Sequence, residues 1–278
     1  MSREHVDHQD IADFAQEKVN LPKDKADEHR AQARRLREKL ETYIGEHADF
    51  SLKRMQLSGS LAKGTALRSL NDIDIACYIS GADAPHDVSK LLNYLAERLR
   101  TAFPNFRPDQ VKPQTYSVTV SFRGSGLDVD VVPILYDGDP QWFGNLVSQD
   151  DGSLLETNIP FHLEFTQKRK QAQPTHFSQV VRLVKFWAQR IKRENDSFRF
   201  KSFMIEMILS RLCDKGLDFS DYPEALQHFF TYIARNNMRE RIVFSDYYNP
   251  TTVGSFSESV QIIDPVNAKN NVGRLYSA

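Results

Sequence analysis

The sequence predicts an α+β protein of two lobes, a mixed sheet backed by helices followed by a helical lobe. One observation is that the segments 72–79, 115–122 and 127–135 alternate apolar and polar residues or are rich in β-branched residues. Gly, Pro and Asn separate these segments, as is typical of strands. The other is that apolar residues recur at spacings of three and four after Pro160, as on helices. We therefore expect a sheet domain over 1–160 and a helical domain over 161–278.

Local patterns define the elements of the first lobe. Residues 23–47 are rich in Ala, Glu, Arg and Leu and contain no Pro, which predicts a long helix. A short strand is expected in "RMQL" at 54–57, before the strand "DIDIACYI" at 72–79. Residues 88–103 carry leucines at helical spacing, so we expect a helix between this strand and the two later ones.

The second lobe is expected to be built from helices at 177–193, 202–216 and 222–237. The preceding stretch "ETNIPFHLEF" interrupts both the strand pattern and the helix pattern, which is why we place the boundary there. The basic run "QKRK" at 167–170 is expected to be solvated.

The composition argues against several classes of protein. With 26% charged residues, 40% hydrophobic residues and a formal net charge of -1, the chain resembles neither a histone nor an acidic tail, so any polyanion site must be local. Cys77 and Cys213 lack the spacing of a zinc site or disulfide framework. The sequence contains neither the apolar segment of a signal peptide nor about 18 consecutive apolar residues. We expect a cytoplasmic protein that does not bind membranes.

Two pairs of aspartates carry the main chemical signal. Side chains alternate along a strand, so Asp72 and Asp74 emerge on one face and repel each other unless a cation joins them. Oxygen ligands suit a hard ion such as Mg²⁺, which also takes nucleotide phosphates as ligands. Asp128 and Asp130 in "LDVDVV" repeat this geometry, and parity alone does not decide which of them reaches the same site.

A glycine-rich stretch precedes the first aspartate pair. Gly59 and Ser60 follow the short strand, and Gly64 and Thr65 come next, which suits a turn whose N–H groups and hydroxyls approach phosphate. No Gly-Lys-[Ser/Thr] is present, so this is not a Walker A loop. The combination with the two later Asp-x-Asp strands is far more specific than either motif alone.

These motifs resemble those of the polymerase β-type nucleotidyltransferases. Within that superfamily, "GSLAKGTALRSLNDIDI", "LDVDVVP", "VVRLVKFW" and "IIDPVNAKNN" look like the oligoadenylate synthases and the bacterial cGAS/DncV-like nucleotidyltransferases. The resemblance implies two Mg²⁺ ions, with Mn²⁺ as a substitute, held by Asp72, Asp74 and a third aspartate. It favours Asp130 over Asp128, because Asp130 directly precedes "VVP" as in the family.

The resemblance also implies nucleotide-binding residues: Gly59, Ser60, Lys63, Thr65, Arg182, Lys185, Ser202 and Phe203. Arg182 and Lys185 share one helix face, which taken alone would be a solvated face. Ser202 alone could be only a helix N-cap, and Phe203 could be a core residue instead of a base-stacking one. Asp264 and its neighbours in the "DP" signature are expected to be structural.

The implied reaction joins ribonucleoside triphosphates through attack of a ribose hydroxyl on an α-phosphate, with release of pyrophosphate. ATP is the expected substrate, with GTP or a pyrimidine nucleotide next, and the product is a cyclic or short linear second messenger. The family further implies anti-phage signalling through a messenger-responsive effector protein. With no basic surface evident, we expect no obligatory nucleic acid.

Two alternatives stay open at this stage. A terminal nucleotidyltransferase of the CCA-adding or poly(A)-like kind would need a broad basic surface for RNA, which the near-neutral charge disfavours. An inactive nucleotide-binding module would have no need of Ser60, Asp72 and Asp74 together with Asp130.

Overall fold

The computed structural model describes residues 6–46, 51–70, 72–81, 84–124, 126–147, 152–198 and 200–276. The chain folds into two compact units, each described below by itself. The sheet unit comprises Pro22–Gly64 and Leu70–Pro160, and the helical unit comprises Met1–Leu21, Thr65–Ser69 and Phe161–Ala278. The division into domains 1–160 and 161–278 stays a prediction.

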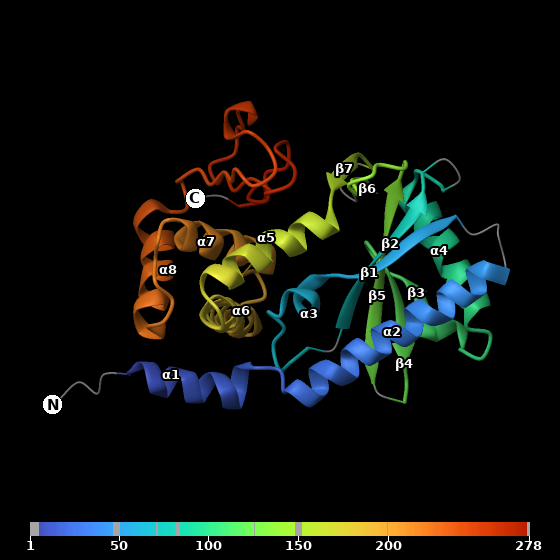
Figure 1. The fold of residues 1–278 in the computed structure, drawn as a ribbon, viewed down its shortest axis with the longest axis horizontal. Helices are drawn as coiled ribbons and strands as arrows, with labels where there is room; N and C mark the ends of the chain where they lie inside the picture. Colours follow the sequence, from blue (N-terminus) through green and yellow to red (C-terminus); the bar gives the residue numbers. More distant parts are fainter. Residues whose placement is uncertain are drawn as a thin grey trace. The chain divides into compact units, whose positions relative to one another are not determined.

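The sheet unit is built on a mixed sheet, as expected for the α+β class (Figure 1). Its order is β1-β2-β5-β4-β3, and β6 pairs with both β5 and β7. The central pair β2 and β5 is parallel, and the other pairs are antiparallel. The bounds are β1 Leu52–Leu57, β2 Asp72–Ser80, β3 Val111–Pro113, β4 Val118–Phe122, β5 Leu127–Tyr136, β6 Gly144–Val147 and β7 Leu154–Thr157.

Two helices cover one face of this sheet. The long helix α2 (Lys23–Glu46) and the amphipathic helix α4 (Val88–Ala102) contact each other and the strands. Both confirm the helices expected from the sequence. Buried residues fill the space between helices and strands: Leu36, Leu40, Leu91, Leu95, Leu99, Ile73, Ile75, Val129 and Val131. The remaining helical segments of the unit are α3 (Gly59–Lys63) and the 3₁₀ turn η2 (Pro108–Gln110).

The opposite face of the sheet changes character along β2 and β5. At the start of β2 it carries Asp72 and Asp74, because these alternate with the buried Ile73 and Ile75. Further along the same face, a small apolar cluster forms around Tyr78. Only one end of this face is therefore available for polar chemistry.

The helical unit contains the helices expected at 177–193, 202–216 and 222–237, which the structure confirms as α6 (His176–Glu194), α7 (Ser202–Asp214) and α8 (Tyr222–Asn236). It also contains α1 (His8–Phe14), the π-helix η1 (Ala15–Val19), the 3₁₀ turn η3 (Pro250–Thr252) and nearly all of α5 (Ile159–Ala172). No described helix is long and apolar enough to cross a membrane.

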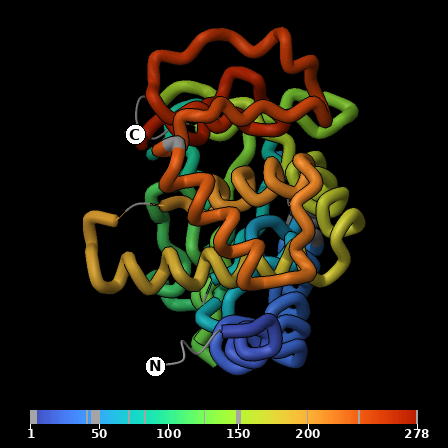
Figure 2. Tube along the Cα trace, turned by 90° about the vertical axis from the view of Figure 1, so that its left-hand side faces the viewer, coloured from blue at the N-terminus to red at the C-terminus, as the bar shows by residue number. Residues whose placement is uncertain are grey.

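Helix α5 and the C-terminal segment were not expected in this form. The apolar residues of "IPFHLEFTQKRKQA" do not gather on one helix face, so the pattern gave no helix for α5. After α8 the chain is largely irregular, as the red trace in Figure 2 shows, and isolated bridges join Ile242 to Ile262 and Ile263 to Asn271.

The short segment Thr65–Ser69 is held by the helical unit through several hydrogen bonds. The backbone N–H of Arg68 donates to the Val19 carbonyl at 2.8 Å, and its guanidinium donates to the Gln16 carbonyl at 2.8 Å. The Ser69 hydroxyl donates to Gln189 of α6 at 3.0 Å. The chain therefore leaves the sheet unit between α3 and β2 and is fixed by helical-unit residues there.

The expectation that "QKRK" is solvated is wrong for Arg169, which is only 6% exposed. Its guanidinium donates to Asp214 at 2.6 and 3.0 Å and to Asp246 at 2.6 and 2.9 Å, and lies over the Phe165 ring. Burial lowers the pKa of Arg169, but hydrogen bonds and attraction from the two carboxylates raise it overall. This ion cluster joins α5 to α7 and to the segment after α8.

Removing the buried cation should destabilise the protein far more than removing its exposed neighbour. We expect Arg169→Met to lower the free energy of unfolding by about 3–5 kcal/mol, since it leaves Asp214 and Asp246 without their closest cation. The control Lys168→Met removes an exposed pair with Glu164 and a longer contact of 3.9 Å to Asp246, and it should cost less than about 1 kcal/mol. Urea unfolding followed by circular dichroism measures both, and equal losses would contradict the assignment.

Candidate active site

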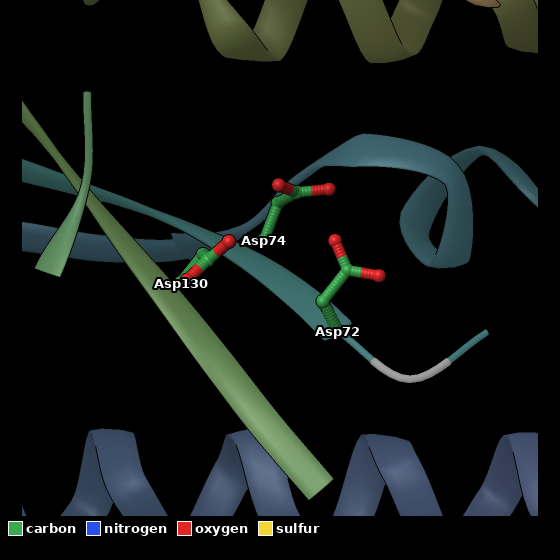
Figure 3. Close-up of side chains that lie close together, drawn as sticks. All are labelled: Asp72, Asp74 and Asp130. Carbon is green, nitrogen blue, oxygen red and sulfur yellow. The ribbon is translucent and has the colours of Figure 1, made fainter. Parts of the chain in front are cut away.

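Three carboxylates gather on the open end of the sheet unit's polar face. Asp72 and Asp74 come from β2 and Asp130 from β5, and the parallel register places Asp74 beside Asp130. One ligand atom from each lies within 4.8 Å of the others. Figure 3 shows the three side chains on two strands, gathered in one place. Within the described part of the chain, no other group of three His, Cys, Asp or Glu side chains is suited to hold a metal ion.

The geometry favours Asp130 over Asp128 as the third carboxylate. Asp128 shares the face and pairs with Asp72 across the strands, but it does not belong to the cluster. The Thr119 hydroxyl donates to Oδ1 of Asp130 at 2.5 Å, which fixes that carboxylate from the neighbouring strand β4. The alternation of side chains along the strand had left both Asp128 and Asp130 possible. The place of Asp130 in the cluster and its bond to Thr119 favour Asp130.

The cluster fits a divalent cation. All of its donors are carboxylate oxygens, the ligands that Mg²⁺ prefers. Asp72 is exposed and the other two are half-buried, so the charges are partly withdrawn from water. Like charges at this separation repel, and a cation between them would relieve that repulsion.

Gly59 is required by its closeness to Asp74. Its backbone is left-handed, with φ of +63°, and a Cβ atom built on it would lie 1.8 Å from Oδ2 of Asp74. The neighbouring Ser58 N–H donates to the Asp74 carbonyl at 2.9 Å, which holds the two segments together. Only glycine meets both the conformational and the spatial requirement.

The stretch beginning at Gly59 is a short helix instead of the expected turn. Helix α3 covers Gly59–Lys63 and ends at Gly64, which is left-handed with φ of +72°. The Gly64 N–H donates back to the carbonyls of Leu61 and Ser60, as in many helix C-termini. Ser60 and Lys63 are half-buried on this helix, within the unit that carries the three aspartates.

Lys185 and Thr65 lie in a buried cluster of the helical unit. The Lys185 ammonium donates to Oε1 of Glu206 at 2.6 Å and to the Thr65 hydroxyl at 3.0 Å. Thr65 in turn donates to Glu206 at 3.2 Å and has no exposed surface. The alternative of a solvated face is therefore wrong for Lys185, whose side chain is only 5% exposed.

Arg182 is also engaged inside the helical unit. It is half-buried and donates to Asn20 at 2.8 Å and to Gln179 at 2.9 Å. Burial lowers the pKa of its guanidinium. The face of α6 that seemed solvated is thus tied to the N-terminal segment.

Ser202 and Phe203 begin helix α7. Lys201 occupies the N-cap position, so the alternative that Ser202 is the cap is wrong, and Ser202 is exposed as the first helical residue. Phe203 is half-buried against the core and meets the His162 ring edge to face at 5.3 Å. It therefore combines a packing role with remaining exposed surface.

The His162–Asp264 pair was not expected from the sequence. Asp264 is 4% exposed and bonds His162 at 2.8 Å, the Val266 N–H at 2.9 Å and the Asn270 amide at 3.0 Å. Burial raises the pKa of Asp264, but these partners lower it overall. The "DP" signature marked Asp264 as structural, whereas nothing in the local pattern around His162 indicated a partner so distant in sequence.

A mixed sheet that clusters three carboxylates beside a glycine-led helix defines a polymerase β-type nucleotidyltransferase. The chain is 68% identical over 277 residues to a cyclic AMP-AMP-AMP synthase of Escherichia coli strain MS 115-1, covering 100% of this chain and 86% of that protein. It is 33% identical over 259 residues to the CBASS oligonucleotide cyclase CdnC of strain KTE188, covering 91% and 80%. The chain therefore belongs to the bacterial CD-NTase family of CBASS oligonucleotide cyclases.

Solved structures agree with this assignment, although no family model matches the chain. The structure of CdnC with ATP from E. coli MS115-1 has a TM-score of 0.93 and 68% identity, covering 99% of this chain and 86% of that one. The structure of a CdnC:HORMA-deltaN complex from the same source has a TM-score of 0.92 and 66% identity, covering 99% and 85%.

Family membership decides between the alternatives left open by the sequence. The predicted resemblance to the cGAS/DncV-like nucleotidyltransferases, the fold class and the enzymatic activity are confirmed. The chain is a nucleotidyltransferase of cyclic oligonucleotide synthesis in anti-phage signalling, instead of an RNA-adding enzyme or an inactive module.

A methyl group at Gly59 should disable the site without unfolding the sheet. We expect Gly59→Ala to lower turnover at least about a hundredfold, because its Cβ would displace the Asp74 carboxylate. Gly138→Ala is the control, since Gly138 also has a positive φ but no atom within 4 Å of its Cβ position. Pyrophosphate release and thermal unfolding are measured for both, and an active Gly59→Ala enzyme would refute the steric argument.

Proposed function

We propose that the enzyme joins ATP molecules into cyclic AMP-AMP-AMP with release of pyrophosphate. The observation that carries this proposal is the 68% identity to a cyclic AMP-AMP-AMP synthase along the whole chain. The structure of the related CdnC with ATP supports the choice of ATP as substrate. GTP and the pyrimidine nucleotides, which the sequence left as further candidates, are not expected in the product.

We propose that Asp72, Asp74 and Asp130 hold two Mg²⁺ ions, as their clustered oxygens allow. When bound, these ions lower the pKa of the attacking ribose hydroxyl and neutralise the charge of the leaving pyrophosphate. The Thr119 hydroxyl keeps Oδ1 of Asp130 in place, and the absent side chain of Gly59 leaves room for the Asp74 carboxylate. These contacts preorganise the carboxylates of Asp74 and Asp130 before a substrate arrives.

The chemistry needs no protein nucleophile. In each step a ribose hydroxyl oxygen forms a bond to the α-phosphorus of a 5′-triphosphate, which belongs to ATP or, at ring closure, to the linear intermediate. The bond to pyrophosphate breaks, and the hydroxyl proton passes to water. We propose that Ser60 and Lys63 on α3 contact the phosphates, because this helix lies against the aspartate strand. Phe203 is proposed to stack on a base with the part of its ring that remains exposed.

A HORMA-domain protein is the proposed binding partner of the enzyme. The related CdnC was solved in a complex named CdnC:HORMA-deltaN, and it is 66% identical to this chain. No motif in the sequence had indicated such a partner. A messenger-responsive effector remains a prediction from the family, and a cytoplasmic location remains a prediction from the sequence.

Product analysis tests the assigned substrate directly. With Mg²⁺ and ATP alone, we expect a product with the mass of cyclic AMP-AMP-AMP that resists phosphatase. An equal mixture of four ribonucleoside triphosphates should give the same main product. Mass spectrometry with and without a HORMA partner measures this, and a main product containing another base would overturn the choice of ATP.

Neutralising single carboxylates tests the metal ligands. We expect Asp74→Asn and Asp130→Asn each to lower turnover by about a thousandfold, because each removes a charged ligand from the cluster. Asp128→Asn is the matched control on the same strand and face, and it should keep most of the activity. Turnover is compared in Mg²⁺ and Mn²⁺, and a loss confined to Asp128→Asn would reverse the assignment.

A further inference from the structure

His162 of α5 and Asp264 form a pair inside the helical unit, where their side chains are 12% and 5% exposed. Nε2 of His162 lies 2.8 Å from Oδ1 of Asp264. Burial raises the pKa of Asp264, but His162 and the neighbouring N–H donors lower it overall. The carboxylate is therefore ionised near neutral pH and only accepts hydrogen bonds, so Nε2 carries the proton that it donates.

The closing segment of the chain fixes the position of Asp264. The backbone N–H of Asp264 donates to the Asn270 carbonyl at 2.9 Å, and its carbonyl accepts from the Tyr248 hydroxyl at 2.9 Å. The carboxylate also accepts from the Val266 N–H and the Asn270 amide. A carboxylate held at these points fixes both the orientation and the tautomer of the His162 ring that binds it.

Nδ1 of His162 is left as a hydrogen-bond acceptor, because in the neutral ring Nε2 holds the only proton. Nothing within the described part of the chain bonds to Nδ1, and this atom is not one of the fully enclosed polar atoms that lack a partner. It therefore stays accessible. The ring thus presents an oriented acceptor that the protein itself does not use.

The same ring lies against Phe203 at the start of α7. The two ring centroids are 5.3 Å apart and the ring planes meet at 84°. Phe203 is only half-buried, and it is the residue proposed above to stack on a base. Stacking tolerates every base, since each base has a π-face. A polar group beside the stacking ring is therefore needed to select one base over another.

We propose that His162 is a specificity-determining residue, whose Nδ1 accepts a hydrogen bond from the 6-amino group of an adenine stacked on Phe203. Guanine and uracil carry a carbonyl oxygen at the corresponding position, which would face Nδ1 as a second acceptor. The inference rests on the proposed function, because it names the group that selects adenine in the same enzyme. Asp264 acts through His162 and is a positioning residue.

Purine riboside triphosphate, which lacks only the 6-amino group of ATP, tests the proposal. With the parent enzyme we expect a kcat/KM at least about fivefold lower for this nucleotide than for ATP, since one hydrogen bond is lost. His162→Gln keeps an amide N–H for Asp264 but has no acceptor in the place of Nδ1. It should lower kcat/KM about fivefold for ATP and less than about twofold for purine riboside triphosphate.

His228→Gln is the matched control, because His228 is an exposed histidine of α8 that lies 3.6 Å from Glu224. This variant should keep the parent's preference for ATP. Pyrophosphate release is measured at about pH 8.5, where an ordinary imidazole is uncharged. Equal losses for both nucleotides in His162→Gln would indicate a structural role and overturn the proposal. A parent that uses both nucleotides equally would overturn it too, even if thermal unfolding shows that His162→Gln does not fold.

Product formation by the parent enzyme separates this proposal from the function on which it rests. A parent that makes cyclic AMP-AMP-AMP, beside a folded His162→Gln variant that keeps the full preference for ATP, refutes the role of His162 and leaves the proposed function intact. A parent that makes no such product from ATP contradicts the proposed function.

Discussion

The mutual repulsion of three carboxylates is the constraint on which the sheet unit depends. Asp72, Asp74 and Asp130 are held close together although each destabilises the others. Hydrophobic burial on the opposite face of the same strands offsets this repulsion. There Ile73, Ile75 and their neighbours on β5 are buried beneath α2 and α4. A slip of one residue in either strand would exchange carboxylates with core residues, so the hydrophobic core fixes the register and thereby the site.

The three carboxylates are also limited sterically by the residues around them. The backbone of Gly59 approaches Asp74 so closely that no side chain fits between them. On the other side, Thr119 reaches Asp130 from β4. The start of α3 and the neighbouring strand β4 thus border the site, and both are parts of the unit that carries the aspartates. Rigid surroundings of this kind suit a reaction whose acceleration comes from positioning and charge neutralisation.

The sequence revealed features that depend on local periodicity and missed those that depend on distant partners. The period of two exposed the aspartate pairs, and the period of 3.6 located α6, α7 and α8. Helix α5 was not predicted because its apolar residues do not share one face. Arg169 was expected at the surface, since its carboxylate partners lie 45 and 77 residues away along the chain. The ion pair of Lys185 was likewise not predicted, because Glu206 lies 21 residues away.

In the candidate site, too, local patterns were visible in the sequence and distant contacts were not. Parity placed both Asp128 and Asp130 on the polar face, and only the resemblance and then the geometry favoured Asp130. The need for glycine at position 59 is invisible in sequence, because it arises from a side chain fifteen positions later. Local patterns and the family resemblance therefore predicted the three carboxylates that the fold brings together, and tertiary packing determines the contacts around them.

The segment Thr65–Ser69 makes the two units poor candidates for exchange between relatives. Its hydrogen bonds end on Val19, Gln16, Gln189 and Glu206, although the chain on either side of it belongs to the sheet unit. A chimera joined only at residue 160 would combine this segment from one parent with Gln189 and Glu206 from the other. Such contacts would have to change together, so an enzyme of this kind is expected to diverge as one inherited piece instead of by shuffling of its halves.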